Sequence, residues 1–219
     1  MKSVHDMIKR KAIIAAMLTA SIQHGVAQTS IADVWKSMPD SIIPILNSNA
    51  RNEILEMSKF GSAVTTKNLL GGDCKLITMT KNMIDVRLTE KTGVQLLTLE
   101  KADSTKLICM NKYFGSPAID SDVTFYTEDW KKDASISIPS ICADEYFSSC
   151  SVSAAKDSCD SEYEFAILPP VTTAICLSDK DGGEILLTAN APLYVSTEKN
   201  ENKRPKLQKS LKWNGITFK

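Results

Sequence analysis

Ser153 and Lys156 are the residues of this sequence whose types and spacing come nearest to an activated nucleophile. Penicillin-recognising enzymes combine a Ser-x-x-Lys motif with a Lys-Thr-Gly triplet on a strand, and such a triplet occurs here at residues 91–93. The triplet, however, precedes the serine motif in the chain, and Ser153 lies in a polar, serine-rich segment. We therefore interpret the triplet as the start of a hairpin arm and expect no catalytic residue.

Acidic residues offer a second kind of chemistry. Neighbouring pairs such as Glu128 with Asp129, or Glu162 with Glu164, could supply the two carboxylates of a glycosidase. The stretch Asp-Lys-Asp-Gly-Gly-Glu at residues 179–184 has the composition of a calcium loop. Neighbouring exposed acids are usually solvated, and Asp-Gly-Gly is ordinary hairpin-turn chemistry. We therefore expect a turn at residues 179–184, with no metal site and no cofactor.

The first 27 residues are typical of a secretory signal peptide. Lys-Arg-Lys at residues 9–11 precedes an apolar run at residues 12–22, and small residues at positions 25 and 27 suit cleavage after Ala27. No stretch approaches the roughly 18 apolar residues that a membrane span needs. We predict an exported protein, periplasmic or secreted, with no transmembrane segment in the mature chain.

Removal of this segment limits the chemistry of the mature chain. Both histidines, His5 and His24, lie within it, which excludes Ser-His-Asp and Cys-His catalysis and histidine-bound metals. The segment also holds four basic residues and one acidic residue, which leaves 26 − 4 = 22 basic and 26 − 1 = 25 acidic side chains, a net charge of −3. Nucleic-acid binding needs a basic surface, so we expect no nucleic-acid partner.

The six cysteines fall into two kinds. Cys109 and Cys176 lie inside apolar stretches, as small buried side chains do. Cys142, Cys150 and Cys159 lie in the polar segment without the paired Cys-x-x-Cys spacing that zinc sites usually show. Because export permits disulfides, we predict one within this trio, with its pairing left open.

Two helices are expected at the start of the mature chain. Ser30 is a suitable N-cap for the first helix, and Pro39 ends it because proline disfavours helical geometry in the preceding residue. Pro44 distorts any helix that follows directly, since it lacks an N–H donor. Ser48 or Asn49 can cap a second helix, whose apolar residues recur every three or four positions.

Alternating and β-branched residues then predict eight strands, of which the first four form an antiparallel meander because short polar gaps join them. The segment at residues 131–162 is polar and rich in serine and cysteine, and we interpret it as an insertion in one domain spanning residues 28–219. Strands are expected at residues 75–80, 84–88, 94–100, 106–113, 123–127, 172–177, 184–189 and 211–218.

Two parts of this pattern resemble each other. Residues 94–117 and 172–193 both contain a strand, a polar turn, a second strand and a proline, and each precedes a strand that bears a tryptophan. The sequence therefore leaves two architectures open. We predict an α+β domain in which N-terminal helices pack on an antiparallel β-sheet, with two related half-domains sharing a sheet as the alternative.

Aromatic residues cluster near those tryptophans. Tyr126, Trp130 and Trp213 could form a platform for a carbohydrate or a peptide, and we name them as candidates for surface binding. Packing in the core is the competing interpretation, because large aromatic side chains dominate protein cores.

Four short stretches resemble a known family. They are KSMPDSIIPIL at residues 36–46, NLLGG at 68–72, VTFYTEDW at 123–130 and LKWNG at 211–215. In this order, after a signal peptide, they resemble the domain of unknown function 3256 family. The resemblance implies one continuous domain in an exported protein of a Gram-negative gut anaerobe. It supplies no established activity and no catalytic residues.

We therefore predict a non-enzymatic binding or accessory protein of the cell envelope or secreted space, with a protein, peptide or glycan as its partner. A protein inhibitor or assembly factor is the first alternative. A hydrolase that uses carboxylates or a Ser-Lys pair is the second.

Overall fold

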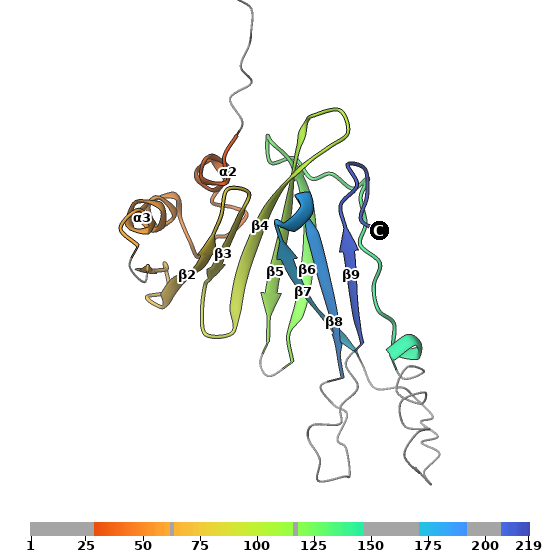
Figure 1. Ribbon diagram of the computed structural model, residues 1–219. Helices are drawn as coiled ribbons and strands as arrows, with labels where there is room; N and C mark the ends of the chain where they lie inside the picture. Colours follow the sequence, from red (N-terminus) through yellow and green to blue (C-terminus); the bar gives the residue numbers. More distant parts are fainter. Residues whose placement is uncertain (1–28, 62–63, 116–117, 147–170, 192–206) are drawn as a thin grey trace, which may run out of the picture.

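Antiparallel strands make up most of the structure, a computed structural model that describes residues 29–61, 64–115, 118–146, 171–191 and 207–219. Six strands form one sheet in sequence order, and three strands form a second sheet in sequence order (Figure 1). The first sheet contains β1 (Thr65–Lys67), β2 (Asp73–Met79), β3 (Met83–Arg87), β4 (Thr92–Glu100), β5 (Lys106–Phe114) and β6 (Asp120–Thr127). The second contains β7 (Thr172–Ser178), β8 (Glu184–Asn190) and β9 (Gln208–Lys212).

Two short helices, α2 (Ile31–Ser37) and α3 (Ser48–Ser58), precede the strands. The Ser30 side chain accepts a hydrogen bond from the Asp33 N–H at 3.3 Å, and the Asp33 carboxylate accepts from the Ser30 N–H at 3.2 Å. This capping box confirms Ser30 as the N-cap of α2. The cap of α3 is Asn47, one residue earlier than expected, and its side-chain oxygen accepts from the Ala50 N–H at 3.0 Å.

The corner between the helices is held by Arg51, a side chain only 1% exposed. Its guanidinium donates to the Leu46 carbonyl at 2.8 Å, to the Met38 carbonyl, and to the Asp40 carboxylate at 2.8 Å. One planar group therefore joins both sides of the proline-bounded stretch. Two prolines can sit in this corner because side-chain donors replace the hydrogen bonds that a continuous helix would make.

Two buried clusters lie on opposite faces of the six-stranded sheet. The first joins apolar side chains of α2 and α3 with Ile84, Leu96 and Met110, which are partners in register across β3, β4 and β5. The second joins the opposite face of the sheet, including Leu97 and Cys109, with the inner face of β7, β8 and β9. The alternation of side chains along each central strand thus supplies both clusters.

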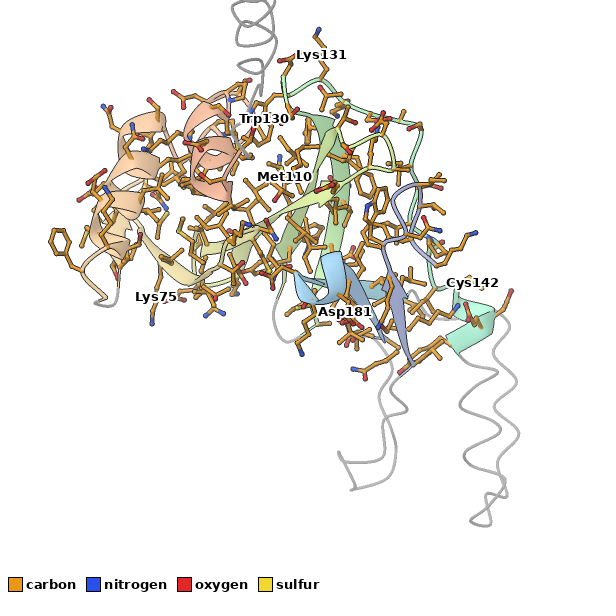
Figure 2. All side chains as sticks on the ribbon, turned by 45° about the horizontal axis from the view of Figure 1, so that its top comes forward. Lys75, Met110, Trp130, Lys131, Cys142 and Asp181 are labelled. Atoms are coloured by element: carbon orange, nitrogen blue, oxygen red, sulfur yellow. The ribbon has the colours of Figure 1, made fainter. Side chains whose placement is uncertain are left out.

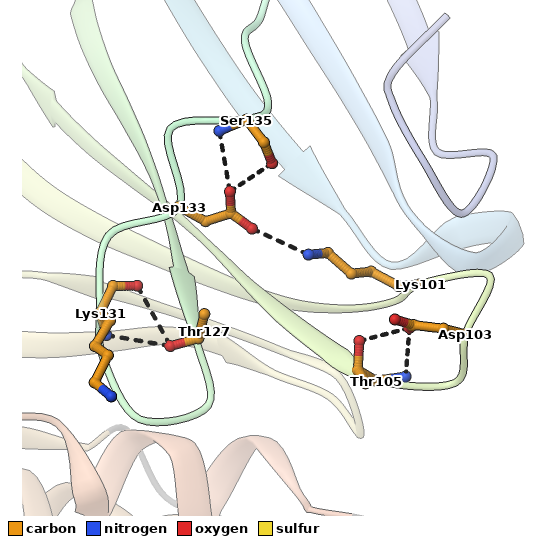
Figure 3. Close-up of polar contacts among 7 residues, drawn as sticks. All are labelled: Lys101, Asp103, Thr105, Thr127, Lys131, Asp133 and Ser135. Atoms are coloured by element: carbon orange, nitrogen blue, oxygen red, sulfur yellow. Dashed lines mark hydrogen bonds and ion pairs between the residues drawn. The ribbon is translucent and has the colours of Figure 1, made fainter.

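The chain that follows β6 crosses from the first sheet to the second and is anchored at Asp133 (Figure 3). The Asp133 carboxylate accepts hydrogen bonds from the N–H and hydroxyl of Ser135 and from the Lys101 ammonium at 3.0 Å. The Ser135 hydrogen bonds, followed by the contact with Lys101, lower the pKa of Asp133 to about 2. Beyond this anchor, the second cluster gains the buried side chains of Ile136, Ile141 and Tyr146.

The expected fold class is correct in part. The chain is mostly β, with one six-stranded and one three-stranded antiparallel sheet and few helices, which lie beside the β2–β3 end of the first sheet (Figure 1). The alternative of two halves sharing one sheet is wrong, because the strands of the two resembling stretches belong to separate sheets. Within the residues described, no helix is both long and apolar enough to cross a membrane.

Three local expectations differ from the structure. The sequence interpretation missed β1, which has only three residues, and it extended the last strand to residue 218, whereas β9 ends at Lys212. The segment expected to be an insertion contributes buried side chains to the core at residues 136–146. The helical turn at residues 143–146 agrees with the short helix that the sequence allows near residues 143–149. Residues 147–170 of that segment lie outside the described residues.

Candidate binding site

The three aromatic residues predicted at the surface do not form one platform. Tyr126 is only 6% exposed and belongs to the cluster beneath the helices, so its assignment as a surface-binding residue is wrong. Its place on β6 opposite Ile108 explains this, because both side chains point to the helix-facing side of the sheet. Trp130 is half-buried, with its ring 5.5 Å from that of Tyr126 and its indole N–H donating to the Ser37 hydroxyl at 3.1 Å.

Trp213 lies with the other cluster, on the far side of the sheet. Its ring centroid is 5.1 Å from that of Phe218, whose ring lies 6.2 Å from that of Phe125 in the second cluster. The indole N–H of Trp213 donates to the Glu100 carbonyl at 2.7 Å. Both tryptophans therefore have packing partners and hydrogen-bond acceptors inside the molecule, which is how aromatic side chains behave in cores.

The structure confirms only part of the division of the cysteines that the sequence suggested. Cys109 is buried on β5, and burial raises the pKa of its thiol, whereas Cys176 on β7 is exposed rather than buried. Cys142 is exposed at the end of the molecule opposite Lys75 (Figure 2). Cys150 and Cys159 lie outside the described residues, so the disulfide within this trio stays a prediction.

The motifs weighed for catalysis are turns and hairpins wherever the structure describes them. The Lys-Thr-Gly triplet leads into β4, which begins at Thr92, as expected for a hairpin arm. Residues 179–184 form the β7–β8 turn, where Asp181 pairs with Lys212 at 2.9 Å. Ser153, Lys156, Glu162 and Glu164 lie outside the described residues.

A buried polar row crosses the interface between the two sheets. Asp85, Gln95 and Asn111 are in-register partners on β3, β4 and β5. The Gln95 amide donates to Asp85 at 2.9 Å and accepts from Asn111 at 3.1 Å and from the Leu177 N–H at 3.0 Å. Asn111 also donates to the Ile175 carbonyl at 2.7 Å. Side chains of the first sheet thus satisfy the outer edge of β7, which among the described strands pairs with β8 on its other side alone.

Two side chains at the start of β6 complete this support. The Ser121 hydroxyl accepts from the Ile175 N–H at 2.9 Å, and the Asp120 carboxylate accepts from the Thr173 N–H at 3.2 Å. Every second N–H of β7 therefore donates to a side chain of the first sheet. The polar residues that interrupt the apolar strands at positions 85, 95 and 111 hold the second sheet in place.

Asp85 is the carboxyl group of this row, and its surroundings change its pKa. Burial raises its pKa, while hydrogen bonds from Gln95 and Tyr113 oppose that change. The Tyr113 hydroxyl donates to Asp85 at 3.1 Å, and burial, followed by the Asp85 charge, raises the pKa of Tyr113 to about 12. The Tyr113 ring crosses Gly93, where an added Cβ would lie 2.1 Å from the ring. The row is therefore tightly packed, and its hydrogen bonds support β7, while the buried side-chain oxygen of Asn111 accepts no hydrogen bond from the described residues.

A different surface is open, along the outer edge of β2. β1 pairs with the first three residues of β2 only, and the Val64 carbonyl then accepts from the Leu76 N–H at 3.0 Å. Past Leu76, no strand among the described residues pairs with this edge. The Thr80 N–H donates to the Met83 carbonyl on the β3 side at 2.8 Å, so alternation directs the Met79 N–H to the open side.

A groove of about 660 Å³ follows this open edge. The end of α3 forms one wall through Ser58 and Gly61, and the edge of β2 forms the other through residues 75–80. Ile77 lies on the groove at a break in the β2–β3 register and is 46% exposed, although it is a large apolar residue. Exposed strand edges of this kind are normally covered or charged in monomeric proteins.

The charge of the groove comes from Lys75. It is the one charged residue among the nine described residues that line the groove, and its side chain projects away from the sheet (Figure 2). Asp73, two residues before Lys75 on β2, already pairs with Lys67 at 2.6 Å. The described lining of the groove is therefore mixed, with apolar side chains beside hydroxyl groups and a single cation at one end.

Arg87 lies directly opposite Lys75 on β3. Its charge is partly met inside the molecule, because burial raises the pKa values of Asp85 and Tyr113 and the guanidinium opposes that rise. Lys75 takes part in no ion pair within the described part of the chain and is therefore the cation that remains for a bound group. The arrangement can bind an extended segment along its edge and a negative group at one end.

Sequence reasoning did not find this site. Its walls come from the end of α3 and from a strand whose neighbour stops after three residues, and neither feature has a motif. One signal was present, namely the apolar Ile77 between Lys75 and Thr78 in a strand whose outward residues are otherwise polar.

Comparisons with known proteins support the fold and leave the activity open. The model of a family described as "Protein of unknown function (DUF3256)" matches residues 22–218, which confirms the resemblance that the four short motifs indicated. A solved structure described as a domain of an uncharacterized protein from Porphyromonas gingivalis W83 has a TM-score of 0.61 and 17% sequence identity. The alignment covers 86% of this chain and 96% of that one, which shows a shared fold. No curated protein matches the chain.

Proposed function

Because this chain belongs to the family of unknown function DUF3256, we propose a function from its surface: an exported, non-enzymatic protein that binds an extended polypeptide segment on the open edge of β2. The observation that carries the proposal is the groove between α3 and the part of β2 that β1 leaves uncovered. An added strand gains main-chain hydrogen bonds from such an edge and side-chain contacts from the groove beside it.

The groups near the groove favour binding over catalysis. The Ser58 hydroxyl donates to the Leu55 carbonyl of its own helix at 2.8 Å, so it is not held by a base as a nucleophile would be. The buried carboxyl with a raised pKa, Asp85, is engaged by Gln95 and Tyr113 in the support of β7. Among the described residues, no three His, Cys, Asp or Glu side chains are grouped as a metal site would require.

Export is part of this proposal and rests on the pattern of residues 1–27. Cell fractionation of a Gram-negative host that expresses the chain, followed by N-terminal sequencing, tests it. We expect the protein outside the cytoplasm with Gln28 as its first residue. An uncleaved chain in the cytoplasm would contradict this part of the proposal.

Binding can be measured with a synthetic strand. The probe is the hexapeptide Thr-Val-Thr-Ile-Thr-Val with fluorescein on its N-terminus, titrated with the purified chain and followed by fluorescence anisotropy. Two further peptides carry N-methyl groups on alternate residues, each blocking one edge of the peptide. We expect the unmodified peptide and one methylated form to bind, and the other form to lose binding, because strand addition uses one edge only.

Paired substitutions identify the surface. Ile77→Lys places a charge on the open edge, and we expect it to abolish binding without unfolding the protein, because Ile77 is half exposed. Leu70→Lys is the matched control, since Leu70 is 79% exposed and is not among the groove residues. Equal binding by all three peptides, or an equal loss in both variants, would refute strand addition at β2.

A further inference from the structure

The geometry of the groove limits how a bound strand can continue. A strand added beside residues 77–80 lies on the same line as β1, which occupies the next positions along β2. It meets β1 at Val64, whose carbonyl already accepts the Leu76 N–H at 3.0 Å. The bound segment must therefore end, or leave the sheet, close to Lys75.

Strand direction then determines which end of the segment lies there. β1 is antiparallel to β2, with Thr65 opposite Lys75 and Lys67 opposite Asp73. A segment that continues the antiparallel order of this sheet has its C-terminal end at Lys75. A parallel segment would place its N-terminal end there instead.

Charge selects between the two directions. A free N-terminus carries an ammonium, which the Lys75 side chain would repel. A free C-terminus carries a carboxylate, which the Lys75 ammonium can bind through a charge-assisted hydrogen bond. Asp73, two residues away on β2, is already paired with Lys67, and Lys75 itself takes part in no ion pair among the described residues.

We infer that the groove recognises the free C-terminal end of a protein chain, bound antiparallel to β2, with its terminal carboxylate at Lys75 and an apolar side chain against Ile77. This inference rests on the proposed strand-binding function and adds the direction of the segment and the chemistry of its end. The partner class is therefore proteins whose C-terminal residues are extended, apolar and accessible.

Three forms of the fluorescein-labelled hexapeptide test the inference by anisotropy. One has a free C-terminal carboxylate, the second a C-terminal carboxamide, and the third a carboxamide together with a glutamate in place of its fifth residue. We expect the free acid to bind about tenfold more tightly than the carboxamide, the effect of one charge-assisted hydrogen bond. We expect Lys75→Gln to remove that difference and the control Lys81→Gln, in the β2–β3 turn outside the groove, to keep it.

Each other outcome overturns a defined part of the reasoning. Equal binding of acid and carboxamide, with sensitivity to N-methylation retained, refutes the C-terminal assignment and leaves strand addition intact. Tight binding of the glutamate-bearing carboxamide shows that a side-chain carboxylate is recognised, which also refutes the assignment. Failure of every peptide to bind, with Ile77→Lys without effect, refutes the proposed function and this inference together.

Discussion

Replacing Arg51 by methionine is expected to lower the free energy of unfolding by about 3 kcal/mol. Methionine keeps most of the length of the side chain and removes its donors. The Met38 and Leu46 carbonyls, which accept from the guanidinium, belong to residues that are 2% and 0% exposed. Water cannot replace the lost donors there without opening the corner between α2 and α3.

The magnitude follows from the number of groups left without partners. A buried acceptor that loses its donor costs about 1–3 kcal/mol, so two carbonyls together cost about 2–6 kcal/mol. Part of this cost is offset, because Arg51 is itself buried and its Nε has no hydrogen-bond partner among the described residues. The balance places the loss in the lower half of the range.

Asp40→Asn is the matched control. The Asp40 side chain is 55% exposed, so loss of its charge should cost no more than about 1 kcal/mol. Arg51→Lys retains the positive charge but cannot donate to both carbonyls with a planar fork, and it should resemble Arg51→Met more than Asp40→Asn.

Urea unfolding followed by tryptophan fluorescence measures these effects. Trp35 is a suitable reporter, because it is fully buried and its indole N–H donates to the Arg51 carbonyl at 3.2 Å. The reasoning is wrong if Arg51→Met is as stable as the unmodified protein. It is also wrong if Asp40→Asn destabilises as much as Arg51→Met, since the ion pair rather than the carbonyl contacts would then hold the corner.

Three further substitutions test the polar contacts of the two sheets. Asp133→Asn should lower the free energy of unfolding by about 2 kcal/mol at pH 7, because the pKa of Asp133 is lowered to about 2 in the folded protein. The stabilisation by the Asp133 carboxylate is complete above its unfolded pKa of about 3.9 and disappears as the pH falls through about 2. At that pH, urea unfolding should give equal stabilities for the variant and the unmodified protein. The sign is opposite for Asp85, because burial raises its pKa. The stability of the unmodified protein relative to Asp85→Asn should fall as the pH rises from about 4 through the folded pKa of Asp85. A stability difference that does not change with pH would contradict the effect of burial. Gln95→Ala removes the acceptor of the Leu177 N–H and should lower the free energy of unfolding by about 1–3 kcal/mol. In this variant, amide hydrogen exchange should be faster at Leu177 than at Ile108, because β7 has lost part of its support.

Local features of the chain were predictable because they depend on neighbours in sequence. Ser30 was identified as a cap, Pro39 as the end of a helix and the Lys-Thr-Gly triplet as a hairpin arm, and the structure confirms each. The meander of β2 to β5 followed from short polar gaps between alternating strands. These assignments rest on backbone preferences and on side-chain periodicity, which operate over a few residues.

Burial of individual side chains was harder to predict from the sequence. Tyr126 was named as a surface-binding candidate, with core packing as the competing interpretation, and it lies in the core. Alternation leaves two choices of face, and only the position of the helices decides between them. In the sequence, Asp85, Gln95 and Asn111 are polar residues in three separate, largely apolar stretches. The strand register brings them side by side, and their hydrogen bonds support the second sheet.

By itself the sequence determined the family, the antiparallel strands, the capped helices and the proline corner, since motif order, periodicity and turn chemistry are written along the chain. The tertiary structure alone decided that Arg51 closes that corner, that a polar row supports β7, and that β1 leaves part of β2 open beside Lys75. Those features depend on which residues far apart in the sequence meet in the fold. Hydrogen bonds between strands or to buried carbonyls produce no local sequence pattern from which they could be predicted.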